Sequence, residues 1–241
     1  MPSLSGSRNV AAAIVLMMVA VPLRGQPVLP ASVPTVGVMD FTNAAMIKRE
    51  EFAPITTALA ELLSGQLAGN PSIAVVERAR MHRVLDEQGL VRGGTVDPAT
   101  AARLGRILGA QYMLFGVLVV DPAERMRLDV RAVDVSTTRV LSRFSVNDRG
   151  ADDILRLIDK LAADLHATLK LPGIQPQTPE PTREVTRDQQ RRALVNIARG
   201  LIAERTAGKA DSARAYFRQA LADDDRMGAA RRALTRLGGM E

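Results

Sequence analysis

The stretch from Glu77 to Gly116 constrains the fold of this 241-residue chain more than any other part of it. It contains two amphipathic helical patterns joined by a short connection and followed by an apolar run. Four residues at the spacing of one helix face define the first pattern, namely Met81, Val84, Leu85 and Gln88. Gly89 is expected to end this helix, and the short apolar run Ile73–Val76 before it predicts a strand.

The second helix of this stretch has clear start and stop signals. Asp97 can accept hydrogen bonds from the first free backbone N–H groups, and Pro98 has no N–H that would lack a partner. Gly109 is expected to end the helix, and Tyr112–Val120 then predicts a buried strand. The predicted apolar face consists of Ala101, Leu104, Ile107 and Leu108.

The flanking segments extend this order into an α/β fold. Further strands are predicted at Thr35–Phe41, Met126–Val135 and Val140–Val146, and further helices at Ile55–Ala68 and from Asp152-Asp153 to Leu169. Thr42–Ala53 is predicted to be a polar connection. We therefore expect an α+β sandwich with a mixed sheet of about five strands flanked by helices, followed by a small all-α helical module.

Three sequence motifs in a fixed order resemble one known family. These are ERARMHRVLDEQGL, DPATAARLGRILGAQYMLFG and VRAVDVSTTRVLSR, within the region Val36–Leu169. Together they resemble the periplasmic domain of the CsgG family, the curli production assembly/transport component. Related domains occur at the front of TolB-type proteins and in outer-membrane activators of cell-wall synthases, so the resemblance implies an envelope protein without fixing its task.

The resemblance also implies structural features that this chain alters. Family channels insert membrane hairpins at two points, which here hold Asp121–Arg125 and Asn147–Ala151, too short to cross a bilayer. The family's constriction loop corresponds to Thr42–Ala53, where Phe52 and its neighbour Glu51 are the candidate constriction or partner-contact residues. A phenylalanine just before a helix is alternatively a hydrophobic staple onto the next turn.

The two ends of the chain have their own signals. Residues 1–25 predict a signal peptide, with a positive start and a 14-residue apolar segment at Val10–Leu23. Residues 171–184 predict a Pro-rich linker between the α/β domain at 35–170 and a helical module at 185–238. That module resembles one degenerate tetratricopeptide repeat, with helix-packing positions at Gly208, Ala213, Phe217 and Ala220.

Composition narrows the classes of function. The net charge of +6 lies in the tail, because 183–237 holds 13 basic and 7 acidic residues while 27–182 holds 17 and 18. Aromatic residues make up 3% of the chain, which argues against a nucleic-acid reader. The count of zero cysteines excludes disulfides, thiolate chemistry and a lipidated cysteine in this sequence.

No motif indicates catalysis, a metal site or a cofactor, and no small-molecule substrate is expected. His82 and His166 stand alone on separate predicted helices, and Gly93-Gly94 lacks the context of a phosphate loop. We expect a non-enzymatic exported scaffold of cell-envelope secretion or assembly, located in the periplasm or peripheral to the outer membrane, whose partners are copies of itself or an envelope component. The alternatives are a secretion-channel subunit and a regulatory module docking on a cell-wall synthase or TolB-type partner.

Overall fold

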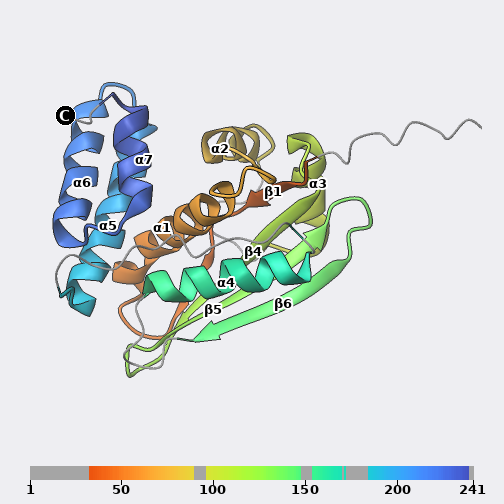
Figure 1. Cartoon of the computed structure of the whole chain (residues 1–241), viewed down its shortest axis with the longest axis horizontal. Coiled ribbons are helices and arrows are strands. Elements are labelled where there is room, and N and C mark those ends of the chain that lie inside the picture. The colour runs from red at the N-terminus through yellow and green to blue at the C-terminus, as the bar shows by residue number, and fades with distance from the viewer. Residues whose placement is uncertain (1–32, 90–95, 148–153, 170, 172–183, 239–241) are drawn as a thin grey trace, which may run out of the picture. The chain divides into compact units, whose positions relative to one another are not determined.

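The computed structural model of the chain describes residues 33–89, 96–147, 154–169, 171 and 184–238. The predicted signal peptide, the Asp152-Asp153 helix start and most of the predicted linker lie outside these residues. Seven helices and a mixed sheet of six strands confirm the predicted α/β class with a helical C-terminal region (Figure 1). Within the described residues, no helix combines the length and the apolar character that crossing a membrane requires.

The elements follow one another along the chain with these bounds. The strands are β1 (Thr35–Val38), β2 (Thr42–Ala45), β3 (Ala74–Val75), β4 (Tyr112–Val120), β5 (Met126–Asp134) and β6 (Val140–Asn147). The helices are α1 (Arg49–Ala68), α2 (Arg78–Glu87), α3 (Pro98–Leu108), α4 (Ile154–Thr168), α5 (Arg187–Glu204), α6 (Ala210–Asp223) and α7 (Gly228–Arg236).

The sheet is built around β4, the longest apolar strand of the predicted set. Its order is β3-β1-β4-β5-β6, in which β1 is parallel to both β3 and β4, β5 is antiparallel to β4, and β6 is antiparallel to β5. β2 was not predicted, and it pairs with the second half of β4 from Thr42↔Val117 to Ala45↔Val120. Its sequence TNAA lacks β-branched alternation, so this strand depends on its pairing with β4 and not on its own propensity.

The start of α1 differs from the prediction. The helix begins at Arg49 and carries Pro54 inside it, whereas the sequence placed the start after that proline. Lys48 is the N-cap, so Ile47 and Phe52 stand at the N′ and N4 positions that a hydrophobic staple uses. Phe52 therefore lies inside α1, at the N4 position of this arrangement, and does not precede the helix as predicted.

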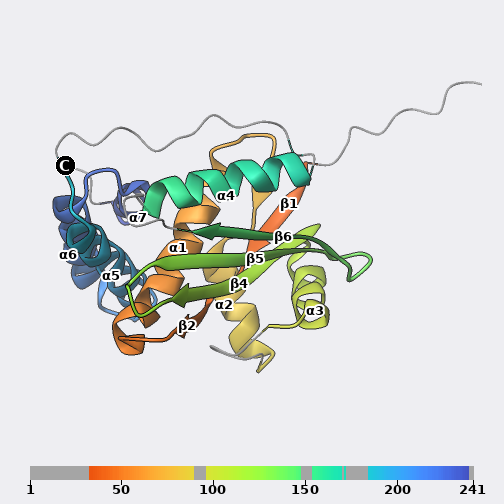
Figure 2. The ribbon, with the colours of Figure 1, turned by 90° about the horizontal axis from the view of Figure 1, so that it is seen from below.

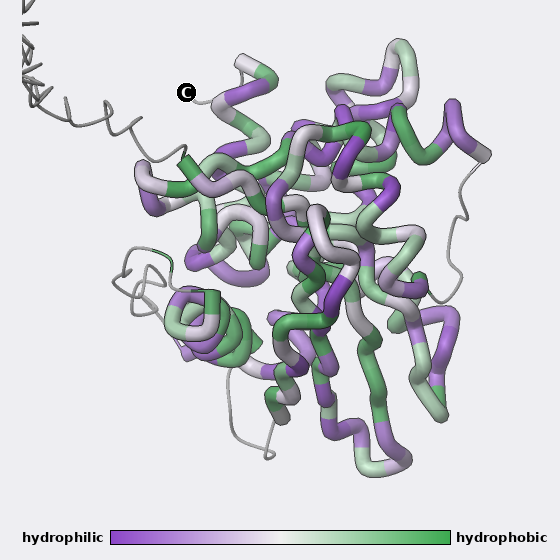
Figure 3. The backbone as a smooth tube through the Cα atoms, turned by 90° about the vertical axis from the view of Figure 1, so that its right-hand side faces the viewer, coloured by the Kyte–Doolittle hydropathy of each residue, from purple (hydrophilic) through white to green (hydrophobic). Residues whose placement is uncertain are grey.

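Each face of the sheet carries its own hydrophobic core. α1 and α4 pack on one face, and the predicted α4 stripe from Ile154 to Leu165 is buried there. Figure 3 shows α4 nearly end-on, with its hydrophobic side turned toward the rest of the fold. α2 and α3 cover one end of the other face, where Met81, Leu104 and Phe115 belong to a second core.

Both helices predicted between Glu77 and Gly116 are present, but on the predicted face of the first one Met81 is buried, Val84 and Leu85 are half-buried, and Gln88 is exposed. The Asp97 side chain accepts a hydrogen bond from the Thr100 N–H at 2.8 Å, and Gly109 ends α3 with φ of 71°. Ala101, Leu104 and Leu108 are buried as predicted. Ile107 is not, because 42% of it is exposed on the side of α3 that faces away from the sheet core.

The helical tail, Arg187–Arg236, packs on α1. α5 and α7 contact α1, and residues of all three tail helices belong to the same core as α1. The α1 face turned to the tail contains small residues: Ala58 is fully buried, and a Cβ at Gly65 would overlap the Arg232 guanidinium. Small residues at these positions permit the close approach of the tail helices.

Within the tail, α5 and α6 form a tightly packed helical hairpin. Gly208 makes the turn between them with φ of 76°, a conformation that favours glycine. The other three predicted packing positions, Ala213, Phe217 and Ala220, are fully buried. This arrangement is compatible with a tetratricopeptide-type hairpin, which stays a prediction.

Candidate functional site: a groove between α1 and α5

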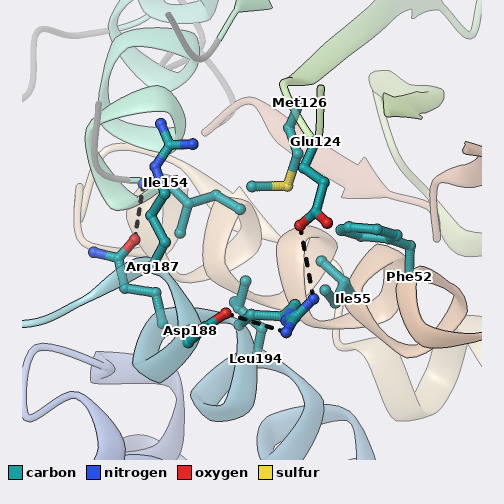
Figure 4. A pocket seen from close by; sticks show the side chains of 10 residues that line it. Phe52, Ile55, Glu124, Met126, Ile154, Arg187, Asp188 and Leu194 are labelled. Carbon is teal, nitrogen blue, oxygen red and sulfur yellow. Dashed lines mark hydrogen bonds and ion pairs between the residues drawn. The ribbon is translucent and has the colours of Figure 1, made fainter. Parts of the chain in front are cut away.

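A small cavity lies where the tail meets the α/β domain. Its floor is apolar, and its volume is about 60 Å³ (Figure 4). The apolar lining comes from α1, β5, α4 and α5, namely Phe52, Ile55, Met126, Ile154 and Leu194. Because an engineered apolar cavity of about 150 Å³ holds a benzene ring, this one has room for a single small apolar side chain.

Charged side chains form the rim of the cavity, and Arg191 of α5 is at their centre. Its guanidinium lies 3.1 Å from Asp188, 3.4 Å from Glu51 and 3.9 Å from Glu124. Glu124 also accepts a hydrogen bond from Lys48 at 2.5 Å, and this bond lowers the pKa of its carboxyl. Arg191 therefore links α5 to α1 through Glu51 and to the β4–β5 turn through Glu124.

A second, wider cavity of about 320 Å³ continues from the first along α1 and α5. Its lining is Glu50, Glu51, Pro54, Arg191, Arg192, Val195, Asn196 and Arg199. Arg192 donates to Asp223 at 3.1 Å, whereas Arg199 has no acidic partner among the described residues. We call the two cavities together the α1–α5 groove: an apolar recess at one end and arginines along the side.

The structure brings both predicted contact residues to this groove. Phe52 is 2% exposed, and its ring lines the apolar recess from inside α1. Glu51 lies on the rim beside Arg191. The predicted tail positions Gly208, Ala213, Phe217 and Ala220 are not in the lining of the groove, since they hold α5 and α6 together.

Sequence reasoning missed the exposed apolar residue of the same segment. Met46 is 70% exposed, and its N–H donates to the Val120 carbonyl at 2.9 Å at the end of β2. Lys48, two residues later, pairs with the rim residue Glu124. The adjacent apolar residues Met46 and Ile47 in an otherwise polar segment were the available signal, but the prediction selected the aromatic Phe52 instead.

A second polar cluster connects the tail to the domain behind the groove. Glu61 of α1 lies 3.4 Å from Arg78 of α2, whose guanidinium also donates to Val38 and pairs with Asp40. On the tail side, Arg236 of α7 makes two bonds to Glu204 of α5 at 2.7 and 2.8 Å. The cluster thus contains one carboxylate–guanidinium pair between α1 and α2 and another between α5 and α7.

Burial shifts the protonation of this cluster. Burial raises the pKa of Glu61, an effect that the nearby positive charges of Arg236, Arg232 and Arg205 partly oppose and that Glu204 reinforces. Burial, together with the charge of Arg205, lowers the pKa of Arg78 to about 9, so its guanidinium is still charged at neutral pH. Ion pairs between packed helices account for the cluster, in which Arg78 and His82 both lie beside Asp40.

These features define a class of protein: an α/β domain with a covering helical tail and a mixed apolar and charged groove. Among the residues that the structure describes, no group of three or more His, Cys, Asp or Glu side chains could hold a metal ion. An apolar recess with an arginine rim is chemistry for binding a polypeptide surface, since aromatic or aliphatic anchors and arginine dominate such contacts.

Part of the chain is similar to the CsgG family, as the first two motifs predicted. Residues 18–120 match the family model for the curli production assembly/transport component CsgG. The match ends with β4, so β5, β6, α4 and the tail lie beyond it. No curated protein gives a significant match to the chain.

Solved structures with a similar arrangement come from several bacteria. The LpoB C-terminal domain from Salmonella enterica is 19% identical, covers 48% of this chain and 82% of its own, and gives a TM-score of 0.38. Lipoprotein GNA1162 from Neisseria meningitidis is 15% identical over 56% of this chain and 96% of its own, with a TM-score of 0.41. The PelC dodecamer from Paraburkholderia phytofirmans is 15% identical over 58% and 89%, with a TM-score of 0.35.

Proposed function

We propose that this protein is a non-catalytic accessory or scaffold protein of cell-envelope secretion or assembly, which binds a protein partner in the α1–α5 groove. The family match supports the setting, because that family is named for curli assembly and transport. The observation that supports the binding site is the apolar recess lined by Phe52 and Leu194, together with Arg199 in the second cavity, which has no acidic partner among the described residues. A partner segment would insert one small apolar side chain and present a carboxylate to the arginines.

The predicted export signal supports a location of this activity in the periplasm or at the inner side of the outer membrane. The partner is then a second copy of this chain or another component of the envelope machinery. A role in curli-type export is the most specific form of the proposal, and it rests on the family name alone.

Site-specific photo-cross-linking in the native host tests the proposal. A photoreactive phenylalanine analogue replaces Arg192, which lines the groove, or Met46, which is 70% exposed near its rim. The same analogue at Ser212 and Arg218, exposed positions of α6, provides matched controls. The proposal predicts one discrete product from the groove positions, whose second component is this chain or an envelope protein, and none from α6.

Reversing the charge of one groove arginine tests whether the cross-link reports a specific contact of the partner with the groove. Arg199→Glu, at the rim arginine without an acidic partner, is expected to reduce the Met46 cross-link about tenfold, the effect of losing roughly 1.4 kcal/mol of binding. Arg218→Glu makes the same charge change and is expected to leave the product unchanged. Equal products from all positions, or measurable turnover of an envelope substrate by the purified chain, would refute the proposal.

A further inference from the structure

The second face of the sheet is open over β4, β5 and β6. Figure 2 looks onto this face, with α1 behind the strands and α2 and α3 to one side. On β4, Phe115 is buried under the second core, while Val117 and Val119 further along the strand are half-buried. Among the described residues, therefore, the helices of this face cover one end of the strands and leave the other end to solvent.

The side chains on this open face are arranged in rows across the strands. Residues paired in register point to the same face of a sheet. One row runs from Val117 through Asp129 to Ser145, and the next row brings Arg131 opposite Arg143. Arg127 lies two residues before Asp129 on the same side of β5. The open face thus combines a narrow apolar strip on β4 with three arginines on β5 and β6.

Among the residues that the structure describes, the charges of this face are not balanced. Asp129 pairs with Arg127 at 3.0 Å and accepts a hydrogen bond from Ser145 at 2.8 Å. Arg131 and Arg143 are exposed, face each other directly across two strands, and have no acidic partner among the described residues. Like charges at directly opposed positions destabilise a sheet, so folding alone does not account for this pair.

We propose that the open sheet face binds an acidic amphipathic helix of a partner protein. Directly opposed side chains on neighbouring strands have Cβ atoms about 5 Å apart, and residues at positions i and i+4 of a helix have Cβ atoms about 5–6 Å apart. One such acidic pair can therefore meet Arg131 and Arg143 together. The apolar side of the same helix would rest on Val117 and Val119.

Other occupants fit the face less well. The strip on β4 consists of half-buried valines and offers no large exposed side chain for insertion into a lipid bilayer. A second copy of this chain fits less well, because its net charge of +6 would bring an excess of like charge to the arginines of this face. The partner is therefore a different, acidic protein.

A defined peptide tests this inference. The probe is a fluorescent 18-residue helical peptide with leucine along one side and two glutamate pairs at i, i+4 beside it, and a peptide with lysine in place of glutamate is its control. Fluorescence anisotropy against the purified chain is expected to give binding of the acidic peptide that weakens with salt. The lysine peptide is expected not to bind.

One substitution separates binding from folding. Arg143→Glu turns the like-charge pair with Arg131 into an opposite-charge pair, so the melting temperature is expected to rise or stay the same while the peptide binds at least tenfold more weakly. Arg218→Glu on α6 carries the same charge change and is expected to leave binding within twofold of the native chain.

Three results would overturn the inference. The first is equal weakening by Arg143→Glu and Arg218→Glu, which would show attraction to net charge alone. The second is the absence of peptide binding at low salt. The third is Arg143-dependent binding to vesicles containing 30% phosphatidylglycerol without binding to the peptide, which would show a lipid surface in place of a helix.

Discussion

Gly200 of α5 lies directly against the ring of Phe217 of α6: a Cβ built on Gly200 would be 2.6 Å from the Phe217 Cε1 atom. Phe217 is fully buried, and Gly200 occupies the middle of an 18-residue helix. The close packing of α5 on α6 therefore depends on the absence of a side chain at one position. Since α5 also lines the α1–α5 groove, this contact helps to fix the shape of the candidate site.

Gly200→Ala is expected to destabilise the protein by about 1 kcal/mol. Overpacking costs about 1–3 kcal/mol, and the better helix propensity of alanine returns up to about 1 kcal/mol. In a Phe217→Leu background the smaller side chain makes room, so the same change should become neutral or stabilising. Urea denaturation of the four proteins in this cycle measures the coupling, and additive effects would show that the two residues do not touch.

Phe52→Ala is expected to reduce the free energy of unfolding by about 3–5 kcal/mol, because the ring is 2% exposed and packs in the main core. Tyr216→Ala, at a side chain 36% exposed on α6, serves as the control and should change stability by less than about 0.5 kcal/mol. A loss at Phe52 as small as at Tyr216 would mean that the ring is not packed under the groove.

Thr186→Ala is expected to cost about 1 kcal/mol. Thr186 caps α5 through a reciprocal arrangement: its hydroxyl accepts from the Gln189 N–H at 3.2 Å, and the Gln189 side chain accepts from the Thr186 N–H at 2.8 Å. Thr235→Ala removes a threonine from an exposed helical position that is not a cap, so it should be neutral or slightly stabilising. Thermal denaturation of both variants measures the two changes in stability. An equal loss of stability at the two positions would contradict the capping role of Thr186.

Glu61→Gln is expected to change the pH dependence of stability. The pKa of Glu61 is raised in the folded protein above its ordinary value near 4.5, so its contribution is fully present below that pH and is lost as the pH rises through the folded pKa. The difference in stability between native protein and variant should therefore shift in favour of the variant as the pH rises from 4.5 through the raised pKa of folded Glu61. Denaturant unfolding at several pH values measures this difference, and a constant difference would show that Glu61 is not buried among its arginines.

Much of the α/β fold could be predicted because its signals are local. Asp97, Pro98 and Gly109 mark both ends of α3, and the alternation in Met126–Val135 gives the strand and its buried side. Two features could not be found in this way. β2 is held by its pairing with β4, and α1 continues through Pro54, so both depend on contacts between distant parts of the chain.

The candidate site was predictable in part for the same reason. Phe52 and Glu51 were selected from the resemblance, and both lie at the groove. Arg191 and Arg199 are ordinary solvated arginines as far as sequence shows, and they line the groove only because the tail packs on α1. A contact between helices that lie far apart in the sequence leaves no local pattern of apolar residues. The packing of the tail on α1 could therefore not be predicted from the sequence.

The α1–α5 groove exists only if the tail packs on α1, and the rate at which a maleimide labels a single thiol tests this packing most directly. The chain has no cysteine, so Ala58→Cys places one thiol on the fully buried α1 face beneath the tail, and Ala163→Cys places one on an exposed position of α4. With both variants folded, we predict that a maleimide labels Cys at position 58 at least about 100-fold more slowly than at position 163, because labelling requires the tail to open. Equal rates would mean that the tail does not cover α1 in solution, and the α1–α5 groove would not exist.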